Sequence, residues 1–263
     1  MRTSKLVGGL FLLLLAAGWL PSPASAENEA TATVAPEVRS AIERMGAYLD
    51  GLASFRIRAH GISDEIDEDT GRRLQFGSTI EATLRRPDRL RLTHTTAGGR
   101  QEFFYDGARL TLHDTEPGYW AAFPVVGDVD TALERASEEI DVVPPLADFF
   151  YRAPQEILAE HAASGIALGP DLVDGVLCEH FAFSREDTDW QVWIEAGDRP
   201  VPRKLVITST DLPGTPQFGV VITSFEPGVE AEDALFEFVP REGATRIEFL
   251  RVEPDDEASE EPS

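Results

Sequence analysis

Apolar residues repeat at every second position over much of this chain, and that alternation constrains its fold more than any other feature. Phe55, Ile57 and Ala59 alternate with polar residues, which is typical of a strand with one buried face. The dipeptide Asp106–Gly107 separates two apolar segments and is a strong short-range signal of a hairpin. The pattern therefore predicts an antiparallel sheet built from sequential hairpins.

Two segments depart from the alternation. A helix is predicted over residues 36–50, because apolar residues recur there at helical spacing and Gly51 follows as a stop. Residues 129–162 carry apolar residues spaced as in short helices, which are broken at Pro144 and Pro154. A sheet that carries its helices as one group belongs to the α+β class. Further strands are predicted after this insertion, at 176–184, 190–195, 204–210, 218–225 and 246–250.

The first 26 residues have the three parts of a secretory signal peptide. Arg2 and Lys5 are followed by an apolar run over 6–20 and by a small-residue cleavage site at 24–26. The apolar run is shorter than the roughly 20 residues of a spanning helix, so cleavage is favoured over an uncleaved membrane anchor. No cysteine stands at the processing site, so a lipoprotein is not expected. The mature protein is predicted to lie free in the periplasm.

Composition sets the organisation of the remaining chain. Residues 27–36 are expected to form a disordered leader and residues 252–263 an acidic disordered tail, which leaves 37–251 as a single domain. Asp and Glu outnumber Lys and Arg by 47 to 23, giving a net charge of −24. That charge disfavours nucleic acids and anionic membranes as partners. Cys178 cannot form an intramolecular disulfide and is predicted to be a small buried side chain.

Three segments resemble LolA-type periplasmic lipoprotein carriers. Residues 84–92 contain an Arg-Pro segment that precedes an apolar strand, and residues 104–110 contain the aromatic and Asp-Gly hairpin that follows it. Residues 234–244 are similar to the closing Phe-x-Phe-x-Pro-x-x-Gly segment of those carriers. The chain resembles most closely a branch of predicted periplasmic proteins of unknown function that share this fold.

The resemblance implies an incomplete, strongly curved antiparallel β-barrel with an N-terminal helix and a mid-chain helical lid. It also implies that the arginine before the proline, Arg86, ties the strand wall to the lid. Arg85 and Arg86 are adjacent and point to opposite faces of a strand, so the sequence leaves open which of them faces inward. A solvated surface arginine is the alternative for Arg86.

The candidate ligand-binding residues combine this arginine with large apolar side chains of the strands and the insertion. For any one aromatic residue among them, filling a core is the alternative. The set is Arg86, Leu90, Leu92, Phe104, Phe149, Phe150, Trp190 and Trp193.

No catalytic motif is recognisable, and the histidines are too scattered for a local metal site. The acidic residues between Asp64 and Asp69 do not match a calcium-binding loop. We therefore expect no catalytic residue, metal or cofactor. The predicted function is a periplasmic binding protein for a hydrophobic ligand, either a lipid or acyl chain or an acylated protein. The alternative is a structural protein or sensor of the cell envelope, which uses the same fold to bind an envelope protein.

Overall fold

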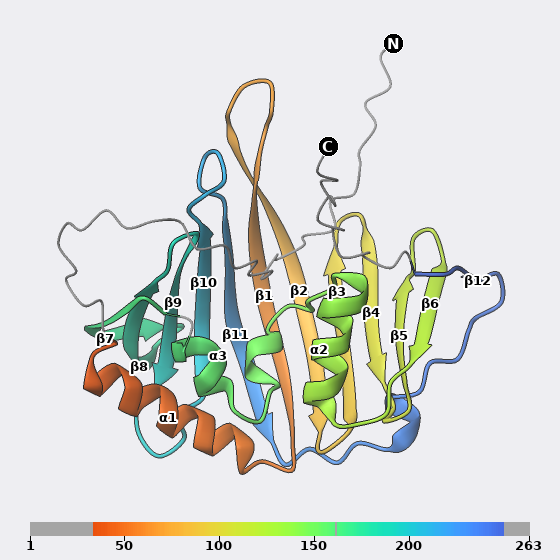
Figure 1. The fold of residues 1–263 in the computed structure, drawn as a ribbon, viewed down its shortest axis with the longest axis horizontal. Coiled ribbons are helices and arrows are strands. Elements are labelled where there is room, and N and C mark those ends of the chain that lie inside the picture. Colours follow the sequence, from red (N-terminus) through yellow and green to blue (C-terminus); the bar gives the residue numbers. More distant parts are fainter. Residues whose placement is uncertain (1–33, 161, 250–263) are drawn as a thin grey trace, which may run out of the picture.

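One sheet of twelve strands dominates the computed structural model, which describes residues 34–160 and 162–249 (Figure 1). The strands lie in the order β12-β6-β5-β4-β3-β2-β1-β11-β10-β9-β8-β7, and all neighbours are antiparallel except β12 and β6. Their bounds are β1 (Ser54–Ile66), β2 (Arg73–Arg85), β3 (Arg89–Thr96), β4 (Gly99–Tyr105), β5 (Arg109–Asp114), β6 (Tyr119–Pro124), β7 (Ser164–Val173), β8 (Val176–Ser184), β9 (Thr188–Glu195), β10 (Pro202–Ser209), β11 (Gln217–Pro227) and β12 (Thr245–Arg246).

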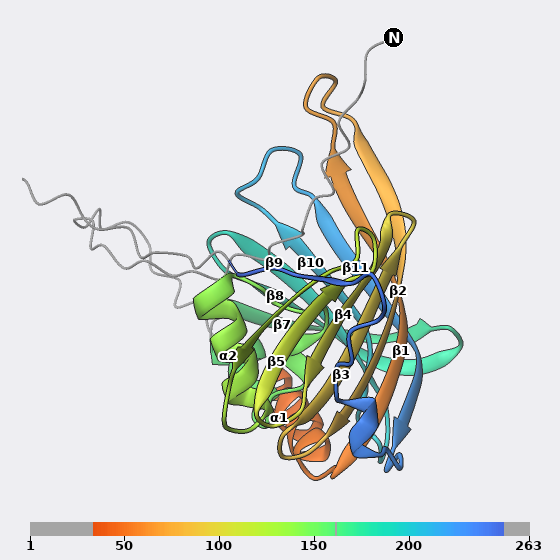
Figure 2. The same cartoon turned by 90° about the vertical axis from the view of Figure 1, so that its right-hand side faces the viewer.

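Four of the helices of the described chain lie against one face of this sheet (Figures 1 and 2). They are α1 (Pro36–Asp50), α2 (Val129–Ile140) and α3 (Pro154–Glu160), together with the short 3₁₀ helix η1 (Ala147–Phe149). A second 3₁₀ helix, η2 (Asp233–Leu235), follows β11. The predicted α+β fold, with its N-terminal helix and mid-chain helical insertion, is confirmed.

Alternation along the strands divides the sheet into two chemically different faces. On β1, Phe55, Ile57 and Ala59 are buried in the main core, which the helices cover. Arg58 and His60, which precede and follow Ala59, are exposed on the opposite side, because successive side chains of a strand point to opposite faces. We call these the helix-covered face and the outer face.

The sheet is open and is not strongly curled, which corrects the predicted strongly curved half-barrel. Its two edges are β7 and β12, which lie at opposite ends of the strand order. Bulges are the main devices that bend strands sharply. Between named strands of the described chain, the register shifts at only three places, at Arg58/Ala59, Ala167/Gly169 and Pro202/Lys204. The sheet therefore has few bulges that could bend its strands into a barrel.

The helix α1 begins and ends where the sequence predicts. Its apolar stripe, which includes Val38, Ile42, Met45 and Leu49, is completely buried against the sheet side of the molecule. Pro36 occupies the first turn, where its missing N–H removes no helical hydrogen bond. Burial of this stripe, rather than helix propensity alone, fixes the helix on the sheet.

The strand β7 was not predicted. It contains Gly165, Gly169 and Pro170, which weaken the strand pattern, and most of its residues are exposed. Val34 pairs with Gly165 in a parallel bridge and is buried, although the sequence assigned it to the leader. The expected signal peptide, most of the leader and the acidic tail lie outside the described residues.

No helix within residues 34–160 and 162–249 is long and apolar enough to cross a membrane. Cys178 is buried and free, as the sequence predicts.

Removal of the Asp128 carboxylate is expected to destabilise α2. Its Oδ1 accepts hydrogen bonds from the Thr131 backbone N–H at 3.0 Å and from the Thr131 hydroxyl at 2.9 Å. Asp128→Ala should lower the free energy of unfolding by about 1 kcal/mol at pH 7, measured by urea unfolding.

The backbone hydrogen bond from Thr131 is the main cause of the lowered pKa of Asp128. The stabilisation is therefore present above the pKa of the unfolded chain and is lost as the pH falls through the folded pKa. Asp128→Asn keeps an acceptor at this position and should retain most of the stability. Equal losses in the alanine and asparagine variants would contradict the capping role.

Candidate functional site

The lid, which we define as residues 129–160, packs large apolar side chains onto the helix-covered face. Phe149 and Phe150 have no exposed surface. The Phe150 ring lies 6.3 Å from the Phe55 ring of β1, and Phe55 in turn stacks on Phe225 of β11 at 5.2 Å. The underside of the lid is therefore a continuous part of the main core.

Arg86, directly after β2, joins the sheet to the lid. Its Nη1 donates to the Phe150 carbonyl at 3.2 Å and its Nη2 donates to the Tyr151 carbonyl at 3.1 Å. Its Nε is buried and has no hydrogen-bond partner among the described residues. Burial lowers the pKa of Arg86, while the nearby carboxylates of Asp130 and Asp50 raise it, and the guanidinium remains charged. Two hydrogen bonds thus hold the lid at this point, and the buried Nε–H donor remains unused.

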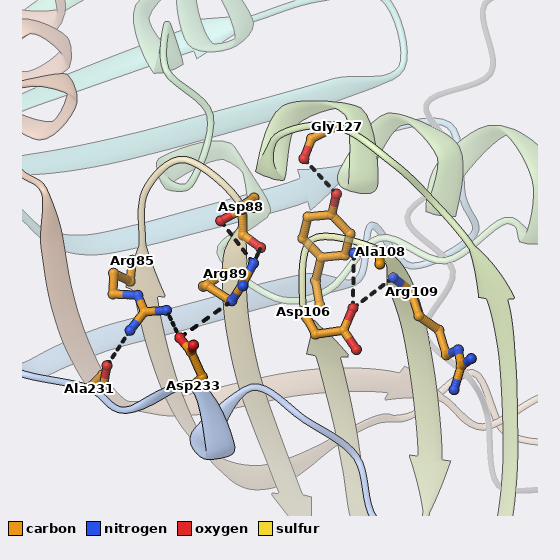
Figure 3. Close-up of polar contacts among 10 residues, drawn as sticks. Arg85, Asp88, Arg89, Asp106, Ala108, Arg109, Gly127, Ala231 and Asp233 are labelled. Carbon is orange, nitrogen blue, oxygen red and sulfur yellow. Dashed lines mark hydrogen bonds and ion pairs between the residues drawn. The ribbon is translucent and has the colours of Figure 1, made fainter.

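Arg85 faces the other way and binds the C-terminal segment 228–247, which we call the strap (Figure 3). Its Nη1 donates to the Ala231 carbonyl at 2.6 Å, and its Nη2 forms an ion pair with Asp233. Arg89 Nε lies 3.9 Å from the same Asp233 carboxylate. The question that the sequence left open is therefore answered: Arg86 contacts the lid and Arg85 contacts the strap.

Six of the eight predicted ligand-binding residues lie on the helix-covered face. Leu90, Leu92 and Trp190 belong to the main core with Phe149 and Phe150, and Arg86 contacts the lid. The Trp190 Nε1 is buried and has no hydrogen-bond partner in the part of the chain that the structure describes.

Phe104 and Trp193 lie on the outer face, which corrects their grouping with the lid. Phe104 alternates with Phe103 and Tyr105 of the main core, and its ring contacts Phe238 of the strap at 5.2 Å. Trp193 belongs to a separate small cluster that contains Cys178. The sequence identified these residues as large apolar side chains, but their positions along the strands direct them away from the lid.

A buried charged cluster on the outer face was missed by the sequence reasoning. Glu102 Oε1 accepts from Arg91 Nη2 at 2.7 Å, and Glu102 Oε2 lies 2.8 Å from His113 Nδ1. The Phe238 ring packs on His113 at 5.1 Å. Glu102 and His113 are cross-strand partners, so counting outward from the Asp106–Gly107 turn could have found this pair.

A cavity of about 400 Å³ opens on the outer face of β1–β4 and β11. Most of its lining residues are polar or charged, and they include Arg58, His60, Glu81 and Arg100. Beneath the lid, the described side chains pack against one another as core. Within the described residues, no group of three or more His, Cys, Asp or Glu side chains could hold a metal ion.

Asp148 in η1 makes the packing of the lid dependent on pH. Burial raises the pKa of Asp148 to about 6, and burial together with the Asp148 carboxylate raises the pKa of Tyr151. Because the folded pKa of Asp148 exceeds the unfolded value, the folded protein binds an additional proton between these two values. The contribution of Asp148 to the free energy of unfolding should therefore rise as the pH falls from about 7 to about 4.

Asp148→Asn tests this dependence by urea unfolding across that pH range. The variant should be more stable than the wild type at about pH 7, and this advantage should vanish near pH 4. Asp211→Asn, at an exposed position in the loop between β10 and β11, is the matched control. A pH profile that is the same in the Asp148 variant and the wild type would contradict the assignment.

Comparison with solved structures finds distant matches of similar extent. An uncharacterized conserved protein from Thermus thermophilus matches at 9% identity and a TM-score of 0.45, covering 81% of this chain and 99% of its own. LprF from Mycobacterium bovis matches at 11% identity and a TM-score of 0.42, covering 75% and 97%. A LolA superfamily protein from Nitrosomonas europaea matches at 10% identity and a TM-score of 0.35, covering 76% and 97%.

None of the curated proteins compared matches this chain. A family model described as "Predicted periplasmic protein" matches residues 39–250, which span the whole sheet, most of α1 and the lid. This match confirms the resemblance to a branch of predicted periplasmic proteins. The chain belongs to the DUF2092 family of predicted periplasmic proteins.

Proposed function

We propose that this protein binds an apolar ligand, the acyl chain of a lipid or of an acylated protein, between the lid and the helix-covered face. The observation that carries the proposal is the Arg86 contact with the Phe150 and Tyr151 carbonyls. This contact holds the lid at Phe150, whose side chain packs against Phe55 of the sheet. The protein acts without catalysis, in the periplasm, after cleavage of residues 1–26.

The chemistry of the lid supports exchange with an acyl chain. Phe149 and Phe150 bury apolar surface against Phe55. A ligand that enters here replaces one set of apolar contacts with another, so the hydrophobic contribution is largely conserved. The hydrogen bonds of Arg86 must break as the lid moves, and its Nε offers a donor to a polar ligand group.

The proposal is tested by organic extraction and mass spectrometry of the mature protein, purified gently from the periplasm. A stoichiometric lipid or acylated molecule would support it and identify the ligand class. A blank extract, repeated after incubation with lipids and lipopeptides, would overturn it. The alternative, an envelope protein that binds a partner without a ligand, would then be tested by crosslinking in cells.

A further inference from the structure

The cavity on the outer face is the strongest feature that the lid does not explain. Its volume of about 400 Å³ falls within the range of small-molecule sites. Five strands contribute to it, and it lies on the opposite side of the sheet from the lid. Any ligand bound there is therefore independent of the proposed acyl site.

A β-bulge shapes one side of the cavity. The register between β1 and β11 shifts at Arg58/Ala59, and Thr223 is the additional residue on β11. The Thr223 hydroxyl donates to the Arg58 carbonyl at 3.1 Å. Bulges re-aim side chains and are frequent beside binding sites.

One cross-strand row forms the floor of the site. His60 pairs with Thr79, Thr79 with Thr95, and Thr95 with Arg100, so these four residues lie side by side on β1 to β4. Three strand spacings separate the two ends, a span of about 14 Å between their Cα atoms. The row therefore presents two hydroxyl groups between an imidazole and a guanidinium.

The two ends of this row are available to a ligand. His60 and Arg100 are exposed, and neither side chain has a hydrogen bond or ion pair with the described residues. Arg58 differs, because its Nη1 donates to Glu226 Oε1 at 2.6 Å. Arg100 thus offers the cavity a guanidinium that no described residue engages, and a guanidinium binds carboxylate or phosphate with two parallel hydrogen bonds.

Hydroxyl groups and one carboxylate complete the lining. Thr93, on the neighbouring row, adds a third hydroxyl to those of Thr79 and Thr95, and each hydroxyl both donates and accepts. Glu81 pairs across the strands with Thr93, its Oε1 lies 3.9 Å from the Arg58 Nε, and it can only accept hydrogen bonds. A carboxylate beside an anion site favours a ligand that also carries hydroxyl donors.

We propose that this cavity binds an acidic saccharide, an oligosaccharide whose sugars carry carboxylate or phosphate groups. Arg100 binds the anionic group, while the threonine hydroxyls, His60 and Glu81 bind sugar hydroxyls along the row. The extended row suits a short oligosaccharide better than a single small anion. Although the whole protein is acidic, charges beyond about 8 Å are screened at physiological salt, so the local arginine governs binding.

Isothermal titration with oligogalacturonate tests the proposal on the mature full-length protein. Oligogalacturonate should bind, and Arg100→Gln should weaken its affinity by about tenfold or more, as expected for loss of a charge-assisted contact. Arg109→Gln is the matched control, since Arg109 is exposed on β5 and does not line the cavity. It should change the affinity by less than about twofold.

Maltotriose and inorganic phosphate separate the two parts of the ligand. Neither should bind as tightly as oligogalacturonate, because each supplies only the hydroxyls or only the charge. Equal binding of maltotriose would overturn the role of Arg100, and equal binding of phosphate would overturn the saccharide assignment. Absence of oligogalacturonate binding at about 1 mM would overturn the site itself. None of these results bears on the acyl ligand of the lid.

Discussion

The Arg86→Leu variant is expected to release the lid from the sheet. The substitution leaves the Phe150 and Tyr151 carbonyls without their charged donor. Hydrogen bonds to a charged group contribute about 1.5–3 kcal/mol, so the free energy of unfolding should fall by about 2–3 kcal/mol. Hydrogen exchange should accelerate in residues 129–160, and binding of a hydrophobic dye should increase as the underside of the lid becomes accessible.

Arg85→Leu is the matched control for this experiment. Arg85 is the adjacent residue with the same chemistry, but it contacts Ala231 and Asp233 of the strap. Its loss should accelerate exchange in the strap and leave the lid unchanged. Arg86→Lys should give an intermediate result, because an ammonium lacks the planar fork that reaches both carbonyls. Identical hydrogen exchange in the lids of the two leucine variants would contradict the role of Arg86 in holding the lid.

The Phe55→Ala variant is expected to be the most destabilised single substitution considered. Phe55 has no exposed surface and packs between Phe150 of the lid and Phe225 of β11. Truncation of a buried phenylalanine removes its transfer free energy and leaves a cavity, at about 3–5 kcal/mol. Urea unfolding should detect this loss directly.

Phe76→Ala provides the comparison for Phe55. Phe76 lies on the adjacent strand β2, and 48% of its surface is exposed. Its truncation should change the free energy of unfolding by no more than about 0.5 kcal/mol. Similar losses in the free energy of unfolding of the two variants would contradict the stabilising role of the Phe55 contacts with the lid and β11.

Local sequence patterns predicted several elements to within a few residues. The helix over 36–50 and the strand over 176–184 have the bounds that the sequence indicated. The turn at Asp106–Gly107 joins β4 and β5 as predicted. These features depend on residues close together in the chain, so apolar periodicity and turn residues are sufficient to predict them.

The sequence indicated part of the contact between the sheet and the lid. The family resemblance implied that Arg86 ties the sheet to the lid, and the size of their side chains made Phe149 and Phe150 candidates. The sequence did not separate Phe104 and Trp193 from that group, because face assignment requires the strand register. It also could not place the row from His60 to Arg100, which exists only after four strands have paired.

The sequence alone determined the alternation, the position of α1, the helical insertion and the free buried Cys178, because each depends on composition or on local spacing. Only the tertiary structure decided that β1 pairs with β11 and that the sheet remains open. It also decided that Arg85 and Arg86 bind different parts of the chain. Those outcomes depend on hydrogen bonds and packing between segments far apart in sequence, which no local pattern encodes.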